Sequence, residues 1–301
     1  MDQLRSVLVA VDFSECSDAA LAQACRVAKW NDAKLHVLHV VDELVPHHIA
    51  KALKLTLAEA REHTVRHTRE RIAAGLAQHG PHGADVHVSF GTPIREFLTK
   101  TEEVDADLLV LGVRGLHASP GAGSQASKCV RKVPTRVMLV GENAGGAFKS
   151  VVACVDFSET SNEVLRNAAR VARRDRCRLN VLHVYHAPWH DLHYRAPTVE
   201  ASVEFRTEFQ AELEATMRDF LSPFEEELQG LDVASTLYDC NSYGLGIVEN
   251  AKKTEGDLIV IGTRGRTNLR YVLLGSTAER VLKQAPCSVL AIKPRDFVRP
   301  S

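Results

Sequence analysis

The chain has 301 residues, a length that suggests two domains, each large enough to bury its own core. Its 37 Lys and Arg residues balance 38 Asp and Glu residues, which argues against electrostatic binding of nucleic acid or of an anionic membrane. Seven cysteines without a C-x-x-C pair favour reduced core thiols over a disulfide framework or a zinc knuckle. The apolar run at residues 7–11 is too short for a signal peptide or a membrane span, so we expect a cytoplasmic protein.

Short apolar runs alternate with longer amphipathic stretches along the whole chain. The long stretches at 51–78 and 202–229 carry apolar stripes and predict helices. Because the short runs suit strands buried on both faces, the alternation predicts parallel sheets covered by helices. We predict strands at 6–11, 34–40, 85–89, 107–111 and 136–140, and again at 150–155, 178–184, 232–237, 257–261 and 288–292.

The second half of the chain repeats the first. Residues 7–15 recur at 151–159, 144 positions later, and residues 107–112 recur at 257–262, 150 positions later. The stretch 141–146 is rich in glycine and forms a natural linker. The sequence therefore predicts two tandem copies of one domain, at 1–144 and 147–301.

The fourth strand of the second copy is followed by a glycine loop and then by a helix. Gly262 ends the strand, Gly265 follows, and Gly275 with Ser276 opens an amphipathic segment. Glycine lets backbone N–H groups approach a phosphate, and a helix start adds unpaired N–H groups and a positive dipole end. Two roles are open for Ser276, as the N-cap of the helix or as a phosphate donor.

The spacing Gly262-x2-Gly265-x9-Gly275-Ser276 resembles the nucleotide-binding signature of the universal stress protein family. It matches neither a Walker A loop nor a Rossmann fingerprint. Each copy looks like one domain of that family, and the tandem arrangement is similar to its E-type members. The resemblance implies an α/β fold of two tandem five-stranded parallel sheets with helices on both faces, of the adenine nucleotide alpha hydrolase-like, Rossmann-like class. It also implies a role in the stress response.

Ligands of open parallel sheets lie beyond the carboxyl ends of the strands, where the connections diverge. In the second copy, Asp156 ends the first strand and Val184 ends the second. A carboxylate repels phosphates, so Asp156 suits ribose hydroxyls or a bound Mg²⁺, and its alternative role is that of a turn or capping residue. The resemblance places the backbone of Val184 at the adenine edge. It places Gly262, Gly265, Gly275, Ser276 and Thr277 around the phosphates of ATP, ADP or AMP.

Three neighbours of the glycine loop are secondary candidates. Arg264 and Arg266 flank Gly265 and could neutralise phosphate charge, although arginines at such positions are more often solvated. Thr263 belongs to the same group.

The first copy departs from the loop pattern. Gly112 is present, but Gly123 and Ser124 follow two residues earlier than the signature requires. At ~3.3 Å per extended residue, we expect this deletion to displace the second anchor and to weaken nucleotide binding. Asp12 and Val40 persist, so a remnant pocket is open to another ligand.

Four histidines, His183, His186, His190 and His193, crowd the stretch after the second strand of copy two. No second ligand pair at a recognised spacing accompanies them, so we assign no metal site. The chain also offers no nucleophile with a base and an orienting carboxylate, so we assign no catalytic residue.

The sequence favours a regulatory protein that binds ATP or another adenine nucleotide, with or without Mg²⁺, in the second copy. One alternative is an ATPase or a nucleotidyl-transfer enzyme, and weak ATP hydrolysis stays open. Another is a scaffold for a non-nucleotide ligand or for unknown protein partners. The resemblance further implies that the apolar end strands of the two copies meet in an intramolecular pseudo-dimer, with a homodimer of whole chains allowed.

Overall fold

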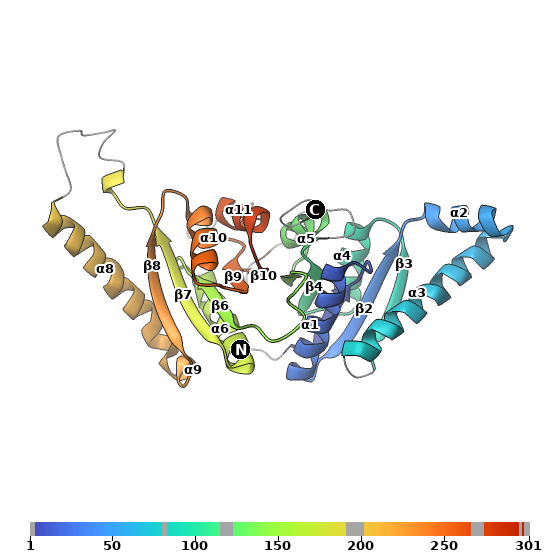
Figure 1. Cartoon of the computed structure of the whole chain (residues 1–301), viewed down its shortest axis with the longest axis horizontal. Helices are drawn as coiled ribbons and strands as arrows, with labels where there is room; N and C mark the ends of the chain where they lie inside the picture. The colour runs from blue at the N-terminus through green and yellow to red at the C-terminus, as the bar shows by residue number, and fades with distance from the viewer. Residues whose placement is uncertain are drawn as a thin grey trace. The chain divides into compact units, whose positions relative to one another are not determined.

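The computed structural model describes residues 4–79, 83–114, 123–190, 202–265, 274–294 and 297. It confirms the predicted α/β fold, in which strands and helices alternate along the chain (Figure 1). The chain divides into two compact units, described separately below. One is Met1–Ala147 with Ser288–Ala291 and Phe297–Ser301, and the other is Phe148–Cys287 with Ile292–Asp296.

The first unit contains a parallel sheet in the order β3-β2-β1-β4-β5. The last strand of the chain, β10 (Ser288–Ile292), joins this unit through residues 288–291 and pairs antiparallel with β5. The bounds of the parallel strands are Ser6–Ala10 (β1), Lys34–Val41 (β2), Asp85–Phe90 (β3), Leu108–Gly112 (β4) and Arg136–Val140 (β5).

The second unit repeats the order of the first four strands, as β8-β7-β6-β9. Its strands lie where the repeat predicts them. Their bounds are Ser150–Cys154 (β6), Arg178–Tyr185 (β7), Val233–Asp239 (β8) and Leu258–Gly262 (β9).

Helices cover both faces of each sheet. The strand order reverses beside β1 and beside β6, and right-handed crossovers on either side of a reversal place their helices on opposite faces. In the first unit α1 packs against α3 and α4 packs against α5. In the second unit α10 packs against α11. The helices of the first unit are α1 (Glu15–Asn31), α2 (Leu44–Leu53), α3 (Leu57–His79), α4 (Pro93–Glu103) and α5 (Ser124–Lys132). Those of the second are α6 (Glu159–Asp175), α8 (Val203–Leu221), α9 (Glu225–Leu228), α10 (Tyr243–Lys253) and α11 (Ser276–Gln284), with a 3-10 turn at Ser222–Phe224.

The central strands are buried on both faces. Val7, Leu8 and Val9 in β1 and Val151 and Val152 in β6 have no exposed surface. Burying each such side chain contributes roughly 1.5–3 kcal/mol, so these strands anchor the two cores. Within the described segments, no helix is both long enough and apolar enough to cross a membrane.

Both long predicted helices are broken in the structure. The stretch 51–78 is wrong as a single helix, because Lys54 takes a left-handed φ of 54° and ends α2. A new helix begins after Thr56, whose hydroxyl accepts from the backbone N–H of Glu59, while the Glu59 carboxylate accepts from the Thr56 backbone N–H. The stretch 202–229 breaks where Pro223 opens the 3-10 turn.

Candidate functional site

The turn after β6 fixes the carboxylate of Asp156. Its Oδ1 accepts from the backbone N–H of Ser158 at 3.1 Å and from the hydroxyls of Ser158 and Ser161 at 2.5 and 2.7 Å. Ser158, not Asp156, is the N-cap residue of α6. Asp156 therefore holds the turn together, and the same bonds present its carboxylate at the end of the strand.

Phe157, the next residue in this turn, packs against β7. It takes a φ of 62°, a conformation that costs a non-glycine residue about 1–3 kcal/mol and persists only where packing enforces it. Its ring lies 4.3 Å from the ring of buried His183, whose Nδ1 is 2.8 Å from the carbonyl oxygen of Val155. The strained turn is thus tied to both β6 and β7.

The glycine loop after β9 packs directly on this turn. A Cβ at Gly265 would lie 2.5 Å from Oδ2 of Asp156, and a Cβ at Gly262 would lie 2.8 Å from Cγ2 of Thr160. Both approaches are closer than real Cβ contacts, so a side chain at either position would force Asp156 or Thr160 to shift. The structure therefore brings Asp156, Gly262 and Gly265 together.

Gly275 differs from the other two glycines. It is the N-cap residue of α11, and its N–H donates to the carbonyl oxygen of Thr263 at 2.8 Å. Among the described residues, a Cβ at Gly275 would meet no atom closer than 3.6 Å, so these residues leave room for a side chain there. The N-cap role considered for Ser276 is wrong, because Ser276 is already the first helical residue. Ser276 and Thr277 occupy the first turn, where N–H groups lack helical acceptors.

Val184 lies in β7, level with Asp156 on the neighbouring strand, since each follows the paired residues Cys154 and Leu182 by two positions. Its side chain is buried and faces α10, where a Cβ at Gly246 would lie 2.7 Å from Val184 Cγ1. Only its backbone is therefore placed to meet a ligand.

The secondary candidates Thr263 and Arg264 are buried, with 0% and 4% of their surface exposed. The view of Arg264 as a solvated arginine is therefore wrong. Thr263 joins the loop to the sheet, since its N–H donates to the carbonyl oxygen of Ile292 at 2.9 Å. Arg266 lies outside the described residues.

In the first copy the loop closes in the same way. The N–H of Gly123 donates to the carbonyl oxygen of Val113 at 2.8 Å, the counterpart of the bond from Gly275 to Thr263. The expectation that the two-residue deletion displaces this anchor is therefore wrong, because Gly123 makes the same backbone bond as Gly275. The side chain of Ser124 lies outside the described part.

A cavity of about 750 Å³ does lie near the expected remnant pocket of the first copy. It lies between the start of α1 and the second half of α3, and its walls include Ser14, Asp18, Arg71 and Gln78. Neither Asp12 nor Val40 lines it. The Asp12 carboxylate instead accepts from the N–H and hydroxyl of Ser14, as Asp156 does from Ser158.

The histidines in and after β7 do not converge on one site among the described residues. His183 contacts Val155, and His190 Nε2 lies 2.9 Å from Oδ2 of Asp239. The rings of His186 and His190 are 5.4 Å apart, and His193 lies outside the described residues. Among the described residues, this stretch gathers no metal-binding set.

The Universal stress protein family model matches residues 3–141 and again residues 147–293. The chain belongs to the universal stress protein family. A universal stress protein of Mycolicibacterium smegmatis is 28% identical over 300 residues, covering 96% of this chain and 97% of the relative. One of Methanocaldococcus jannaschii is 32% identical over 152 residues, covering 50% of this chain and 85% of the relative.

Solved structures show the same fold over the whole chain. A universal stress protein from Archaeoglobus fulgidus aligns with a TM-score of 0.63 at 20% identity, covering 96% of this chain and 98% of that one. A functionally unknown protein from Pseudomonas aeruginosa aligns with a TM-score of 0.64 at 17% identity, covering 98% and 94%. The predicted tandem membership is thereby confirmed.

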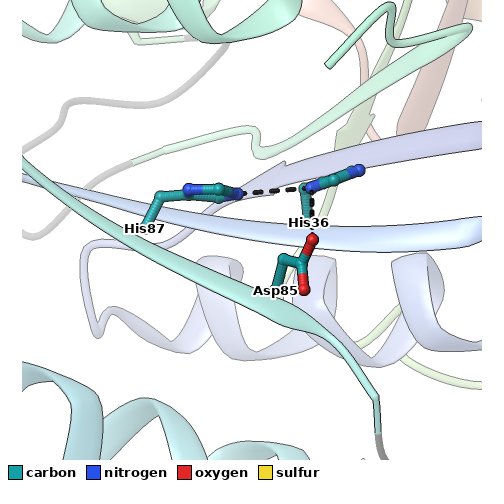
Figure 2. A group of neighbouring side chains, drawn as sticks. All are labelled: His36, Asp85 and His87. Carbon is teal, nitrogen blue, oxygen red and sulfur yellow. Dashed lines mark hydrogen bonds and ion pairs between the residues drawn. The ribbon is translucent and has the colours of Figure 1, made fainter. Parts of the chain in front are cut away.

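This universal stress protein also has a cluster of potential metal-binding side chains that was not predicted from the sequence. It is formed by His36 of β2 and by Asp85 and His87 of β3 (Figure 2). His36 Nδ1 lies 3.3 Å from His87 Nε2 and 3.7 Å from Asp85 Oδ2. Burial lowers the pKa of both imidazoles, assisted at His36 by His87 and at His87 by Lys100. The available signal was an alternating Asp-x-His on a strand expected to pair with the strand that carries His36.

Proposed function

We propose that the second copy binds ATP or another adenine nucleotide, and that this universal stress protein is a nucleotide-binding regulatory protein. The observation that carries the proposal is the room around Gly275. Within the part of the chain that the structure describes, the nearest atom to a Cβ there would be 3.6 Å away, and the backbone angles of −69° and 154° suit any residue. Packing of the described residues does not exclude a side chain at this position, but a ligand that lies close to the backbone would exclude one. A bound ligand therefore accounts for the glycine.

The phosphates of the nucleotide would lie between the glycine loop and the start of α11. The loop brings Gly262 and Gly265 to the end of β9, and the first turn of α11 offers the N–H groups of Ser276 and Thr277. A helix start attracts anions through these N–H groups and through its dipole. Neutral backbone donors of this kind suit a triphosphate or a monophosphate.

The remaining contacts follow from the strand ends. Asp156 is repelled by phosphate, so we assign its fixed carboxylate to the ribose hydroxyls or to a Mg²⁺ ion that keeps most of its water. We assign the backbone at Val184, level with Asp156, to the adenine edge.

The test compares Gly275→Val with its counterpart Gly123→Val in the first copy. Both residues precede a helix as N-cap, so each change should cost a similar amount of stability, about 1 kcal/mol or less. We expect ATP to raise the melting temperature of the wild type and of Gly123→Val, and to leave that of Gly275→Val unchanged.

Equal stabilisation of all three proteins by ATP would overturn the assignment of the phosphates to α11. Absence of stabilisation in the wild type would overturn the nucleotide proposal and favour the scaffold alternative. Release of phosphate from ATP by the wild type, lost in Gly275→Val, would replace a regulatory role by an ATPase.

A further inference from the structure

We propose that His36, Asp85 and His87 of the first copy bind a divalent transition-metal ion, and that Zn²⁺ fits them best. The three side chains lie on the paired strands β2 and β3 of the first copy (Figure 2), whereas the proposed nucleotide site is built from residues of the second copy. The proposal does not depend on nucleotide binding in the second copy.

The register of the two strands brings the ligands together. His36 pairs with Asp85, and His87 follows Asp85 by two residues, so both β3 side chains share the face of His36. The three ligand atoms lie within 4.8 Å of one another. Nitrogen and oxygen ligands at about 2.0–2.2 Å from a tetrahedral Zn²⁺ are separated by roughly 3.3–3.6 Å. The distance of 3.3 Å from His36 Nδ1 to His87 Nε2 has this spacing, and the distance of 3.7 Å to Asp85 Oδ2 is about 0.1 Å longer than this range.

The donor set also has the right chemistry. Two imidazoles and one carboxylate leave a fourth position open for water, as in catalytic zinc sites. His36 is 5% exposed, so its imidazole is shielded from bulk water, and imidazole ligates a metal in its neutral form. Imidazole nitrogen with carboxylate oxygen favours Zn²⁺ over Mg²⁺ or Ca²⁺, which prefer oxygen alone.

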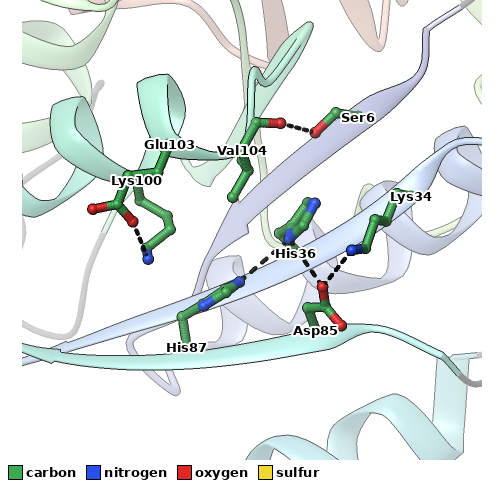
Figure 3. A network of polar contacts seen from close by, with 8 residues as sticks. All are labelled: Ser6, Lys34, His36, Asp85, His87, Lys100, Glu103 and Val104. Atoms are coloured by element: carbon green, nitrogen blue, oxygen red, sulfur yellow. Dashed lines mark hydrogen bonds and ion pairs between the residues drawn. The ribbon is translucent and has the colours of Figure 1, made fainter.

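Two lysines compete with a cation at this site. Lys34 Nζ lies 2.7 Å from Asp85 Oδ2, and Lys100 forms an ion pair with Glu103 beside His87 (Figure 3). The side chain of Lys34 is 59% exposed and can turn into solvent when a metal takes the carboxylate. Removing Lys34 should therefore strengthen metal binding.

In the second copy, the equivalent positions on β7 and β8 carry no histidine or carboxylate. The register places Asn180 at the position of His36, Ala234 at that of Asp85 and Thr236 at that of His87. Asn180 donates to Asn250 Oδ1 at 3.1 Å and accepts from the hydroxyl of Thr236 at 2.7 Å. Hydrogen bonds between neutral side chains occupy these positions in the second copy. The fold therefore does not require His36, Asp85 and His87 in the first copy.

The experiment titrates ZnCl₂ into the untagged full chain by calorimetry and follows CoCl₂ by its visible absorption. We expect one ion per chain, with the strong absorption of tetrahedral Co²⁺. The double variant His36→Asn with His87→Thr gives the first copy the residues found at these positions in the second. We expect its Zn²⁺ affinity to fall by about 100-fold or more, because two of the three ligands are lost. Lys34→Met should bind several-fold more tightly.

Asp85→Ala is a second test that remains valid if the double variant misfolds. It should fold normally, because Asp85 is partly exposed and the second copy has Ala234 at the same position. It should keep the wild-type melting temperature without metal and lose the rise that Zn²⁺ gives to the wild type. Zn²⁺ affinity that is unchanged in Asp85→Ala and in the double variant would overturn the proposal, as would a wild type that binds no Zn²⁺. Either result would leave a histidine pair joined by one hydrogen bond.

Discussion

Phe13 in the first copy and Phe157 in the second follow an aspartate at a strand end, and they take positive φ angles of 65° and 62°. Each ring packs in a tilted arrangement against a histidine of the next strand, with ring centroids 4.6 Å apart for His39 and 4.3 Å apart for His183. The backbone bond that closes the loop after the fourth strand is also 2.8 Å long in both copies. These shared features hold the strand ends in place whatever each copy binds.

The copies differ at positions that the shared fold does not constrain. Beside the shared strands, the first copy has His36 and His87 where the second has Asn180 and Thr236. At the loop, apolar Val113 takes the place of Thr263, and the connection to the next helix is shorter. The comparison indicates that the two copies share one scaffold and differ in the residues proposed to bind ligands.

The largest expected effect tests the shared scaffold at two equivalent glycines. A Cβ at Gly112 would lie 2.9 Å from the backbone carbon of Cys16, whereas a Cβ at Gly262 would first meet the side chain of Thr160. Backbone gives way less easily, so we expect Gly112→Ala to cost about 2–3 kcal/mol and Gly262→Ala about 1 kcal/mol. Urea unfolding of both variants measures the difference, and a larger loss in Gly262→Ala would contradict this packing account.

Asp12 and Asp156 give the next largest effect. Asp156 accepts from Ser158 and Ser161, while among the described residues Asp12 accepts only from Ser14. Replacement by Ala should cost about 1–3 kcal/mol at each position, with the greater loss at Asp156.

Asp156→Asn is the matched probe of binding, because it keeps an acceptor oxygen for the serines. It should lower ATP affinity while changing stability less than Asp156→Ala does. Asp12→Asn should leave ATP affinity unchanged, and calorimetry of both variants checks the contrast. A similar loss of affinity in both would mean that the copies bind nucleotide alike.

A smaller effect concerns pH and His39. Burial lowers the pKa of His39, against the carbonyl of Val11 and the charge of Asp12, which raise it. The folded state therefore prefers the neutral imidazole, and its stability falls as pH drops below about 6.5, the ordinary pKa of histidine, and levels off below the folded pKa. His39→Gln should reduce the slope of unfolding free energy against pH in this window. An unchanged slope would show that His39 does not contribute to acid sensitivity.

The sequence located the strands well because each is a short apolar run bounded by polar residues. It missed the break between α2 and α3, although Thr56 and Glu59 form a recognisable capping box. It found Gly265 from spacing alone, but not the reason for it, since the contact with Asp156 depends on how loop and turn fold together.

The His36 cluster shows a second limit. His36 and His87 are 51 residues apart, and only the register of β2 and β3 brings them to 3.3 Å. A shift of one residue would turn His87 to the opposite face. Sequence periodicity predicts which residues form a strand, but it does not fix which residue of the neighbouring strand lies opposite.

The central claim is that nucleotide binds in the second copy alone. Calorimetric titration of ATP into the full chain, in the presence of Mg²⁺, tests this most directly through the number of sites. We predict one site per chain, unchanged in Gly123→Val and lost in Gly275→Val. Two sites of similar affinity, or one site that survives in Gly275→Val, would contradict the claim.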